Sequence, residues 1–193
     1  MNTHMTLQQI TDEYKNYLRT PDGRKDITTA VRIAKEWTGR DTDVSSSTNG
    51  VQINKLPKFI KEKTQKVPIT GIAVNNLCHT NAKFFSKHGY KYRFGYNITA
   101  CPCGCRMSFE IHSLNEKDGI LYDFTKDFNK ETEKWFYPLA DNWDAWKWIY
   151  FYGRSRDFLM YKKGRCTCPV IWNDDPQILQ IKDIQELQEI VEE

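Results

Sequence analysis

The stretch NLCHTNAKFFSKHGYKYRFGYNITACPCGCRMSFEIHSLNEKDGILYDFT, residues 76–125, decides the fold that the sequence predicts. Helical spacing of small and apolar residues begins at Cys78, and Gly89 ends the predicted helix. Aromatic residues then alternate with polar ones over residues 90–98, and a second alternation follows over residues 107–112. Such alternation indicates strands with one buried face. The stretch therefore predicts a helix followed by paired strands.

A hairpin is predicted at Asp118-Gly119, because Asp-Gly between apolar runs is typical of a two-residue turn. With that turn, His112 lies opposite Thr125, and Asp123 is its diagonal neighbour on the same face. With a four-residue loop, His112 lies directly opposite Asp123. A loop of three or five residues would turn Asp123 to the other face. Two of these registers bring the histidine and the aspartate together.

Two helices are predicted before this stretch. Apolar residues recur at helical spacing over residues 6–19, with Thr6 as a candidate N-cap. They recur again over residues 27–37, where Asp26 is a candidate cap. The intervening Pro21-Asp22-Gly23 predicts a turn.

The composition is that of a globular protein. The chain has 193 residues, of which 39% are hydrophobic and 13% aromatic, so it can bury a substantial core. A net charge of +3 is too small to require a nucleic-acid partner. The polar start MNTHMTLQQITDEY lacks the apolar region of a signal peptide, and no apolar run approaches the length of a membrane span. We therefore expect a cytoplasmic, intracellular protein without a membrane partner.

Cys78, His112 and Asp123 follow one another in the order of a thiol nucleophile, its base and the carboxylate that orients the base. The dipole of a helix stabilises a thiolate in the first turn, which lowers the thiol pKa. Alone, such a cysteine is more often a small buried apolar residue, and a strand histidine is more often structural. The combination of order, helix start and hairpin favours a catalytic triad. This chemistry needs no cofactor.

Acyl transfer also needs N–H donors for the oxyanion that forms at the reacting carbonyl. The backbone N–H of Cys78 is one candidate donor. The second donor is open among three residues near the predicted helix or before it, namely Asn75, Asn76 and Gln65. Either of the two asparagines is also a candidate N-cap of the helix.

The segments CHTNAKFFSKHGYKYRFGYNI and EIHSLNEKDGILYDFT resemble the nucleophile helix and the His–Asp hairpin of the transglutaminase-like (papain-like) cysteine enzyme superfamily. The matching positions are Cys78, Ala82, Gly89, Gly95-Tyr96, His112, Asp123 and Thr125. Leu114 departs from the family's aromatic residue, and the insert CPCGC separates the two strands. The resemblance implies an α+β, papain- or transglutaminase-like fold. In that fold, N-terminal helices precede a nucleophile helix packed on an antiparallel sheet.

The activity that the resemblance implies is acyl transfer at a cysteine. The superfamily includes transglutaminases, peptidases, deamidases and amidases, which form an acyl-enzyme at that residue. A thiol hydrolase or a transglutaminase-like acyltransferase is therefore expected, with a peptide, a protein or a small amide as substrate. The residues leave amide hydrolysis and transamidation open.

One domain is expected over residues 1–193, in three parts. Residues 1–66 form a helical N-terminal part that ends in a short basic helix, and residues 67–128 form the catalytic core. Residues 129–193 are rich in aromatic residues, include the strand-like FLMY at 158–161, and end in an acidic amphipathic helix.

Five further cysteines lie in two clusters, Cys101, Cys103 and Cys105, and Cys166 and Cys168. Four of these thiols could form a tetrahedral, structural zinc site that ties the later segment to the sheet. Free or redox-labile thiols and a disulfide are alternatives. A zinc ligand at His112 is a further alternative, which would remove this residue from catalysis.

The sequence also allows a zinc-stabilised domain that binds nucleic acid or protein without catalysis. Basic residues lie among aromatic ones at Lys58, Lys61, Lys63, Lys66, Arg154, Arg156, Lys162, Lys163 and Arg165. However, 25 acidic residues nearly balance 28 basic ones, and no recognised nucleic-acid motif is present. In a non-catalytic protein, the acidic C-terminal helix would be a docking element for a partner.

Overall fold

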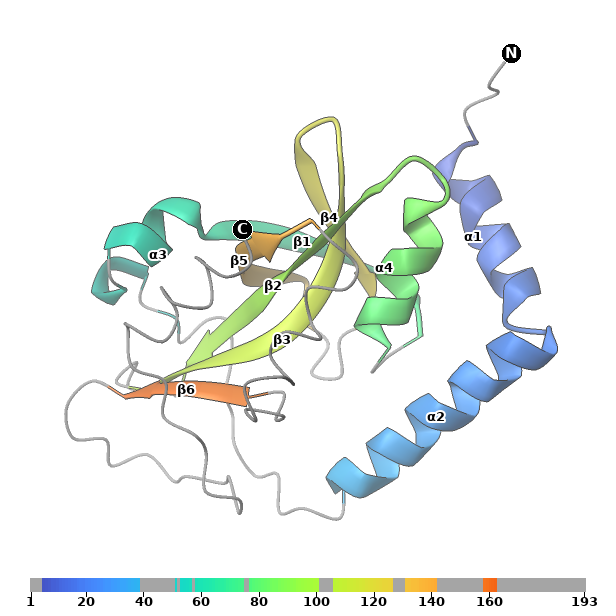
Figure 1. Ribbon diagram of the computed structural model, residues 1–193, viewed down its shortest axis with the longest axis horizontal. Coiled ribbons are helices and arrows are strands. Elements are labelled where there is room, and N and C mark those ends of the chain that lie inside the picture. The colour runs from blue at the N-terminus through green and yellow to red at the C-terminus, as the bar shows by residue number, and fades with distance from the viewer. Residues whose placement is uncertain are drawn as a thin grey trace.

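Five strands form a closed ring in the computed structural model, and a sixth strand extends it at one point (Figure 1). The structure describes residues 5–38, 51, 53–56, 58–74, 77–100, 106–126, 131–141 and 158–162. The strands are β1 Gln65–Ala73, β2 Lys91–Ala100, β3 Arg106–Lys117, β4 Ile120–Thr125, β5 Glu133–Ala140 and β6 Phe158–Lys162. The strands predicted in the central stretch and at FLMY are thus confirmed.

The strand order around the ring is β2-β5-β1-β4-β3, and β3 pairs again with β2. β1 and β4 run parallel, whereas the other neighbours in the ring are antiparallel. The predicted papain- or transglutaminase-like α+β fold, with a nucleophile helix on an open antiparallel sheet, is therefore wrong. Closure occurs because β5 and β4 extend the β2–β3 pair from its two outer edges, and β1 joins them. The backbone groups that the edges of an open sheet would expose are thereby paired.

β5 completes the ring by joining β2 to β1. The sequence indicates this segment only as part of a long aromatic region. Gly95 of β2 lies opposite Pro138 of β5, and a Cβ atom on Gly95 would lie 2.1 Å from the carbonyl oxygen of Tyr137. Glycine is therefore required where these two strands approach each other.

The first helix, α1 Leu7–Tyr17, begins as predicted. The Thr6 hydroxyl accepts a hydrogen bond from the backbone N–H of Gln9 at 3.3 Å, and the Gln9 side chain accepts one from the backbone N–H of Thr6 at 2.7 Å. This reciprocal capping box satisfies two N–H groups that the helix start would leave unpaired. The buried side chains of Ile10 and Tyr14 hold α1 against the remainder of the fold.

The second helix, α2 Pro21–Thr38, begins earlier than predicted, so the predicted turn and the Asp26 cap are wrong. The Thr20 hydroxyl accepts a hydrogen bond from the backbone N–H of Gly23 at 3.2 Å. Proline fits the first helical position because its missing N–H would have no partner there. Asp26 instead accepts a hydrogen bond from the Tyr17 hydroxyl at 2.6 Å.

The remaining helices are short. The 3-10 helix η2 Ile53–Lys55 precedes α3 Lys58–Lys63, which lies within the predicted basic helix. The predicted cysteine helix is confirmed as α4 Cys78–Ser86, which lies beside β2 and β3 (Figure 1). Within the described ranges, no helix is long and apolar enough to cross a membrane.

Two apolar clusters pack the helices onto the outside of the ring. The larger one covers β2, β3 and β5 and includes Ile60 of α3 and Ala82 of α4. The other joins α1 and α4 to the ends of β1 and β4 through Ile10, Tyr14, Ala73, Phe85, Tyr90 and Phe124. These contacts determine where the first turn of α4 meets the ring.

A third apolar cluster fills the inside of the ring. Its members come from four different strands and are Val67, Leu114, Leu121 and Phe136. Side chains two residues apart on a strand share a face. His112 and Asp123 therefore lie on the same strand faces as Leu114 and Leu121. The structure thus places this polar pair in the apolar interior.

Candidate active site

Cys78 is the first residue of α4 and is partly exposed. The N-cap position is Leu77, whose side chain makes no capping hydrogen bond, so the predicted N-cap position at Asn75 or Asn76 is wrong. The backbone N–H groups of an uncapped first turn favour negative charge beside them. The Cys78 sulfur and the Cys78 N–H therefore lie where a thiolate or an oxyanion is stabilised.

His112 and Asp123 form a buried pair within the ring. The Nε2 atom of His112 lies 2.8 Å from Oδ2 of Asp123, and the two residues are 4% and 0% exposed. The hairpin has the predicted two-residue turn at Asp118-Gly119, with φ values of 54° and 78°. In this register the histidine and the aspartate are diagonal neighbours on one face, as the sequence predicts for that loop length.

The first turn of α4 meets β3 where this strand changes partners. Along the edge of β3 that faces away from β2, β6 pairs with residues 106–110 and β4 pairs with residues 115–117. No described strand pairs with this edge over residues 111–114, and α4 packs against β3. Both His112 and its neighbour Ser113 are thus accessible from the helix, although consecutive side chains point to opposite faces of a strand.

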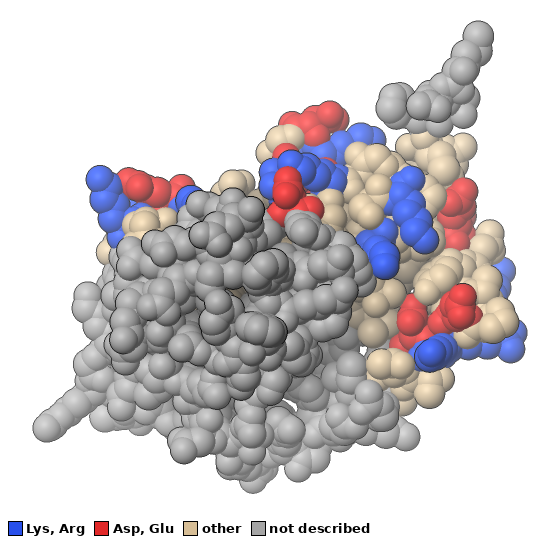
Figure 2. Space-filling model, in the orientation of Figure 1, with Lys and Arg blue, Asp and Glu red and all other residues tan. Residues whose placement is uncertain are grey.

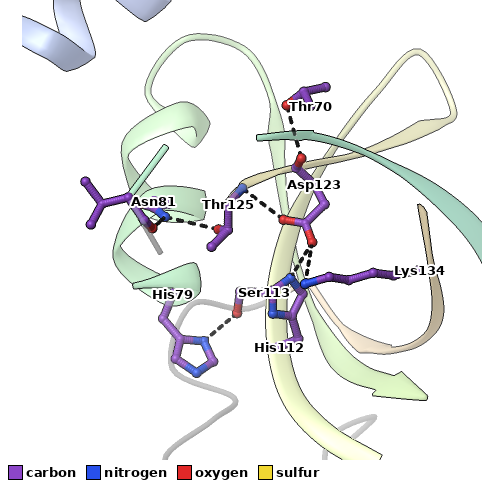
Figure 3. A network of polar contacts seen from close by, with 9 residues as sticks. Thr70, His79, Asn81, His112, Ser113, Asp123, Thr125 and Lys134 are labelled. Carbon is purple, nitrogen blue, oxygen red and sulfur yellow. Dashed lines mark hydrogen bonds and ion pairs between the residues drawn. The ribbon is translucent and has the colours of Figure 1, made fainter. Parts of the chain in front are cut away.

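Asp123 has partners on both carboxylate oxygens (Figure 3). Oδ1 accepts a hydrogen bond from the backbone N–H of Thr125 at 3.0 Å. Oδ2 accepts from His112 and also lies 3.3 Å from Nζ of Lys134 on β5. The Asp123 carbonyl oxygen accepts a hydrogen bond from the Thr70 hydroxyl at 3.0 Å. Each of these contacts fixes the carboxylate that orients the imidazole.

The sequence prediction did not include Lys134. Lys134 is two residues before Phe136, a member of the interior cluster, so the two side chains share one face of β5. A lysine on the buried face of an aromatic strand requires an acidic partner. That partner is Asp123, on a strand that the sequence does not place next to β5.

The charges around Cys78 shift the pKa values of the thiol and of its base in opposite directions. Burial raises the pKa of Cys78, but hydrogen bonds and positive charge from His79 and His112 together bring it well below its usual range. Burial and the Lys134 charge lower the pKa of His112, but the charges of Asp123 and Cys78 and the hydrogen bond to Asp123 together raise it to about 10. The site therefore favours a thiolate beside an imidazolium at neutral pH.

Asp123 stays ionised in this environment. Burial raises the pKa of its carboxyl. The positive charges of His112 and Lys134 and the hydrogen bonds to the carboxylate lower it, and the net pKa lies below its usual range. Charge alternates in sign along the row of groups from the Cys78 thiolate through the His112 imidazolium and the Asp123 carboxylate to the Lys134 ammonium. This alternation offsets the desolvation of each charge.

A second histidine also contacts the nucleophile. His79 follows Cys78 in α4 and lowers the pKa of its thiol, and the Nδ1 atom of His79 lies 2.6 Å from the hydroxyl of Ser113 on β3. The Ser113 hydroxyl in turn lies 2.5 Å from the hydroxyl of Tyr92 on β2. The sequence prediction omitted this histidine because its partners lie on strands that follow later in the chain.

An uncharged network holds the chain just before Cys78. The Asn81 side chain donates to the carbonyl of Val74 at 2.7 Å and to the hydroxyl of Thr125 at 3.0 Å. The Tyr14 hydroxyl donates to Oδ1 of Asn81 at 2.6 Å and accepts from the backbone N–H of Val74 at 3.1 Å. This network joins α1, α4, β4 and the end of β1, so it fixes α4 relative to the ring.

Of the three residues predicted as a second oxyanion donor, the structure describes Gln65 alone. Asn75 and Asn76 lie outside the described residues. Gln65 is exposed at the start of β1, whereas Asp123 lies opposite Ile69, roughly 13 Å further along the same strand. Among the candidates, only the Cys78 N–H is described beside the thiol.

The zinc prediction concerns residues that the structure does not describe, since Cys101, Cys103, Cys105, Cys166 and Cys168 all lie outside the described ranges. Within those ranges, no group of three or more His, Cys, Asp or Glu side chains has the arrangement of a metal site. His112 instead forms a hydrogen bond with Asp123 and lowers the pKa of the Cys78 thiol. Structural zinc at the two cysteine clusters stays a prediction.

Two of the basic residues considered for nucleic-acid binding form ion pairs with acidic side chains. Lys58 pairs with Glu62, and Lys66 pairs with Glu133. Figure 2 shows blue and red side chains intermingled on the part of this face that is coloured. Arg154, Arg156, Lys163 and Arg165 lie outside the described residues, as does the predicted C-terminal helix.

Comparison with known proteins gives no match: no family model, no curated protein and no solved structure is significantly similar to this chain. Inferences about function therefore rest on the geometry and electrostatics around Cys78.

Proposed function

We propose that this protein is a cysteine-dependent acyl-transfer enzyme that acts on carboxamides, with Cys78 as nucleophile, His112 as general acid and base, and Asp123 as the orienting carboxylate. One observation carries the proposal. The Nε2 atom of His112 lies 2.8 Å from the buried Asp123 carboxylate, and this imidazole lowers the pKa of the thiol at the start of α4. A nucleophile, its base and a group that orients the base are the parts that thiol catalysis needs.

The first half of the reaction forms a thioester. The Cys78 thiolate attacks the amide carbon, and the carbonyl π electrons move to the oxygen, which the Cys78 N–H stabilises. When this oxyanion collapses, the C–N bond breaks and the amine leaves with the proton of the His112 imidazolium. The products are an acyl-enzyme at Cys78, a neutral imidazole and a free amine or ammonia.

The second half of the reaction releases the acyl group. Neutral His112 removes a proton from water or from an acceptor amine, which attacks the thioester carbon. Collapse of the second oxyanion expels the Cys78 thiolate and restores the imidazolium beside it. Water gives hydrolysis and an amine gives transamidation, so a single site supports both reactions.

Asp123 keeps His112 in the tautomer and orientation that both steps need. Because its carboxylate holds Nε2, the other ring nitrogen, Nδ1, is the one available for proton transfer at the sulfur. The sequence resemblance to transglutaminase-like enzymes supports the same assignment at Cys78, His112 and Asp123. It concerns these residues and their order, not the open-sheet fold.

Hydroxylamine capture tests this function directly, because hydroxylamine converts an acyl-enzyme to a hydroxamate and frees the thiol. The protein is incubated with glutamine-containing peptides and small primary amides, with and without hydroxylamine. We expect ammonia release, and hydroxamate in the presence of hydroxylamine, from the native protein but not from Cys78→Ser. A hydroxamate signal that persists in Cys78→Ser, or no turnover of any amide in the set, contradicts the proposal.

A further inference from the structure

The polar groups around Cys78 form two arms, and the proposed mechanism uses one of them. The first arm runs from Cys78 through His112 to Asp123. The second runs from Cys78 through His79 to Ser113 and Tyr92, with distances of 2.6 Å between His79 Nδ1 and Ser113 Oγ and 2.5 Å between Ser113 Oγ and the Tyr92 hydroxyl. Figure 3 shows the His79–Ser113 contact next to the His112–Asp123 pair, with each contact formed separately.

We infer that His79 is a second imidazole of the catalytic site, which holds an N–H group on the Cys78 thiolate while Ser113 and Tyr92 fix its tautomer. This inference rests on the proposed function, since it concerns the same nucleophile. It adds a residue that contacts the reacting sulfur and a chain of hydroxyl groups that positions this residue.

One assignment of donors and acceptors along this chain gives His79 the tautomer that the inference needs. Ser113 and Tyr92 are 1% and 6% exposed, so their hydroxyl groups need protein partners. If Tyr92 donates to Ser113 and Ser113 donates to Nδ1 of His79, the proton of the neutral imidazole lies on Nε2. A thiolate only accepts hydrogen bonds, so an N–H donor is the partner that fits it. A protonated imidazole also presents an N–H group there.

The two imidazoles have different surroundings and therefore different functions. His112 has the Asp123 carboxylate behind it, so it can carry a positive charge and deliver a proton to the leaving amine. The Nδ1 atom of His79 meets the Ser113 hydroxyl where His112 meets a carboxylate, so this contact positions the His79 ring without adding negative charge. The second donor stabilises the free Cys78 thiolate before it attacks the amide and again when it leaves the thioester.

The titratable and charged groups near Cys78 come from every element around it. They are His79 on α4, His112 on β3, Asp123 on β4, Lys134 on β5 and, through Ser113, Tyr92 on β2. Removal of one donor to the sulfur leaves the His112–Asp123 pair in place. Loss of His79 should therefore shift the titration of the thiol without abolishing its reaction.

The test is the rate of Cys78 alkylation by iodoacetamide from pH 5 to pH 10, resolved from the other cysteines by peptide mass mapping. For His79→Gln we expect about a tenfold lower rate at pH 6 and a rate within about twofold of the native one at pH 9.5. Ser113→Ala and Tyr92→Phe keep the His79 imidazole but remove hydroxyl groups that fix its tautomer. For these variants we expect a smaller decrease of the alkylation rate, about threefold at pH 6. Melting curves establish that each variant is folded.

His88→Gln is the matched control, because the same substitution is then made just beyond the opposite end of α4, where His88 pairs with Glu13 at 3.3 Å. This variant should keep the native alkylation profile. An unchanged profile in folded His79→Gln overturns the inference even if amide turnover by the native protein is established. A shifted profile with no amide turnover supports the inference about His79 while the proposed function fails, so the two failures are distinguishable.

Discussion

Two buried polar networks meet at the end of β4. They differ in charge, and we assign chemistry to the charged one and support of the fold to the uncharged one. One network contains Cys78, His112, Asp123 and Lys134, and all four groups carry charge. The other contains Tyr14, Asn81, the Val74 backbone and the Thr125 hydroxyl, none of which is charged. The networks adjoin at Thr125, whose N–H binds Asp123 and whose hydroxyl binds Asn81.

The uncharged network has its donors and acceptors matched, so it can hold α4 but has no proton to transfer. The charged network ends at Cys78, a partly exposed residue at which a substrate can meet the nucleophile. Changes in the charged network should therefore affect activity more than stability, and changes in the uncharged network should do the reverse. Four substitutions test this contrast, from the largest expected effect to the smallest.

Cys78→Ala removes the nucleophile. We expect acyl transfer to fall at least about 10⁴-fold, because neither half-reaction can proceed without the thiol. The side chain is small and partly exposed, so the melting temperature should stay within about 3 °C of the native value. Amide turnover and thermal unfolding are measured on the same preparation. Retained activity in this variant would assign the chemistry to another residue.

Asp123→Asn removes the charge that supports His112. Asp123 raises the pKa of His112 against the effect of burial, so its loss lowers that pKa and weakens the thiolate beside it. We expect turnover to fall about 10³- to 10⁴-fold. The pH profile should also narrow, since the acid limb moves up with the thiol and the alkaline limb moves down with the imidazole. An unchanged profile would show that Asp123 does not act through His112.

Asn81→Ala breaks the uncharged network. It removes the hydrogen-bond donor to the Val74 carbonyl and to the Thr125 hydroxyl and the acceptor of the Tyr14 hydroxyl, so the free energy of unfolding should fall by about 2–4 kcal/mol. Below its melting temperature the variant should keep turnover within about tenfold of native. Denaturant unfolding and turnover at low temperature measure the two effects. A 10³-fold loss of turnover in the folded variant would erase the contrast between the networks.

Lys134→Gln removes the cation behind Asp123. Lys134 lowers the pKa of His112, so its loss raises that pKa and moves the alkaline limb of turnover to higher pH. At pH 7 the imidazolium is already favoured, so turnover there should change by less than about threefold. A full pH profile of turnover measures this shift. A shift to lower pH would contradict the electrostatic arrangement around Asp123.

Features that depend on nearby residues could be predicted from the sequence. The Thr6 cap, the cysteine helix and the Asp118-Gly119 turn are each decided by neighbours in the chain. The meeting of His112 and Asp123 follows from that turn, because they lie on the two strands that it joins. Helical and strand periodicity, together with turn chemistry, is sufficient for such features.

Closure of the ring could not be predicted in this way. β1 pairs with β4 across about fifty residues, and β5 inserts between β1 and β2 from later in the chain. Neither pairing leaves a local signal, so Lys134 on β5 was missed with them. A signal was present in β2, where Gly95 and Asn97, which alternate with Phe94, Tyr96 and Ile98, are also buried. Burial on both faces of a strand indicates a sheet that is covered on both sides, as a closed ring is.

The central claim is that Cys78 is a thiolate held by imidazole at neutral pH. The most direct measurement is the ratio of its iodoacetamide alkylation rates at pH 9 and pH 6 in the native protein, resolved by peptide mass mapping. The site predicts a ratio within about threefold, because the pKa of Cys78 lies well below its usual range. A rate that falls about 100-fold or more between these pH values, as for an ordinary thiol with a pKa of about 8.5, would contradict it.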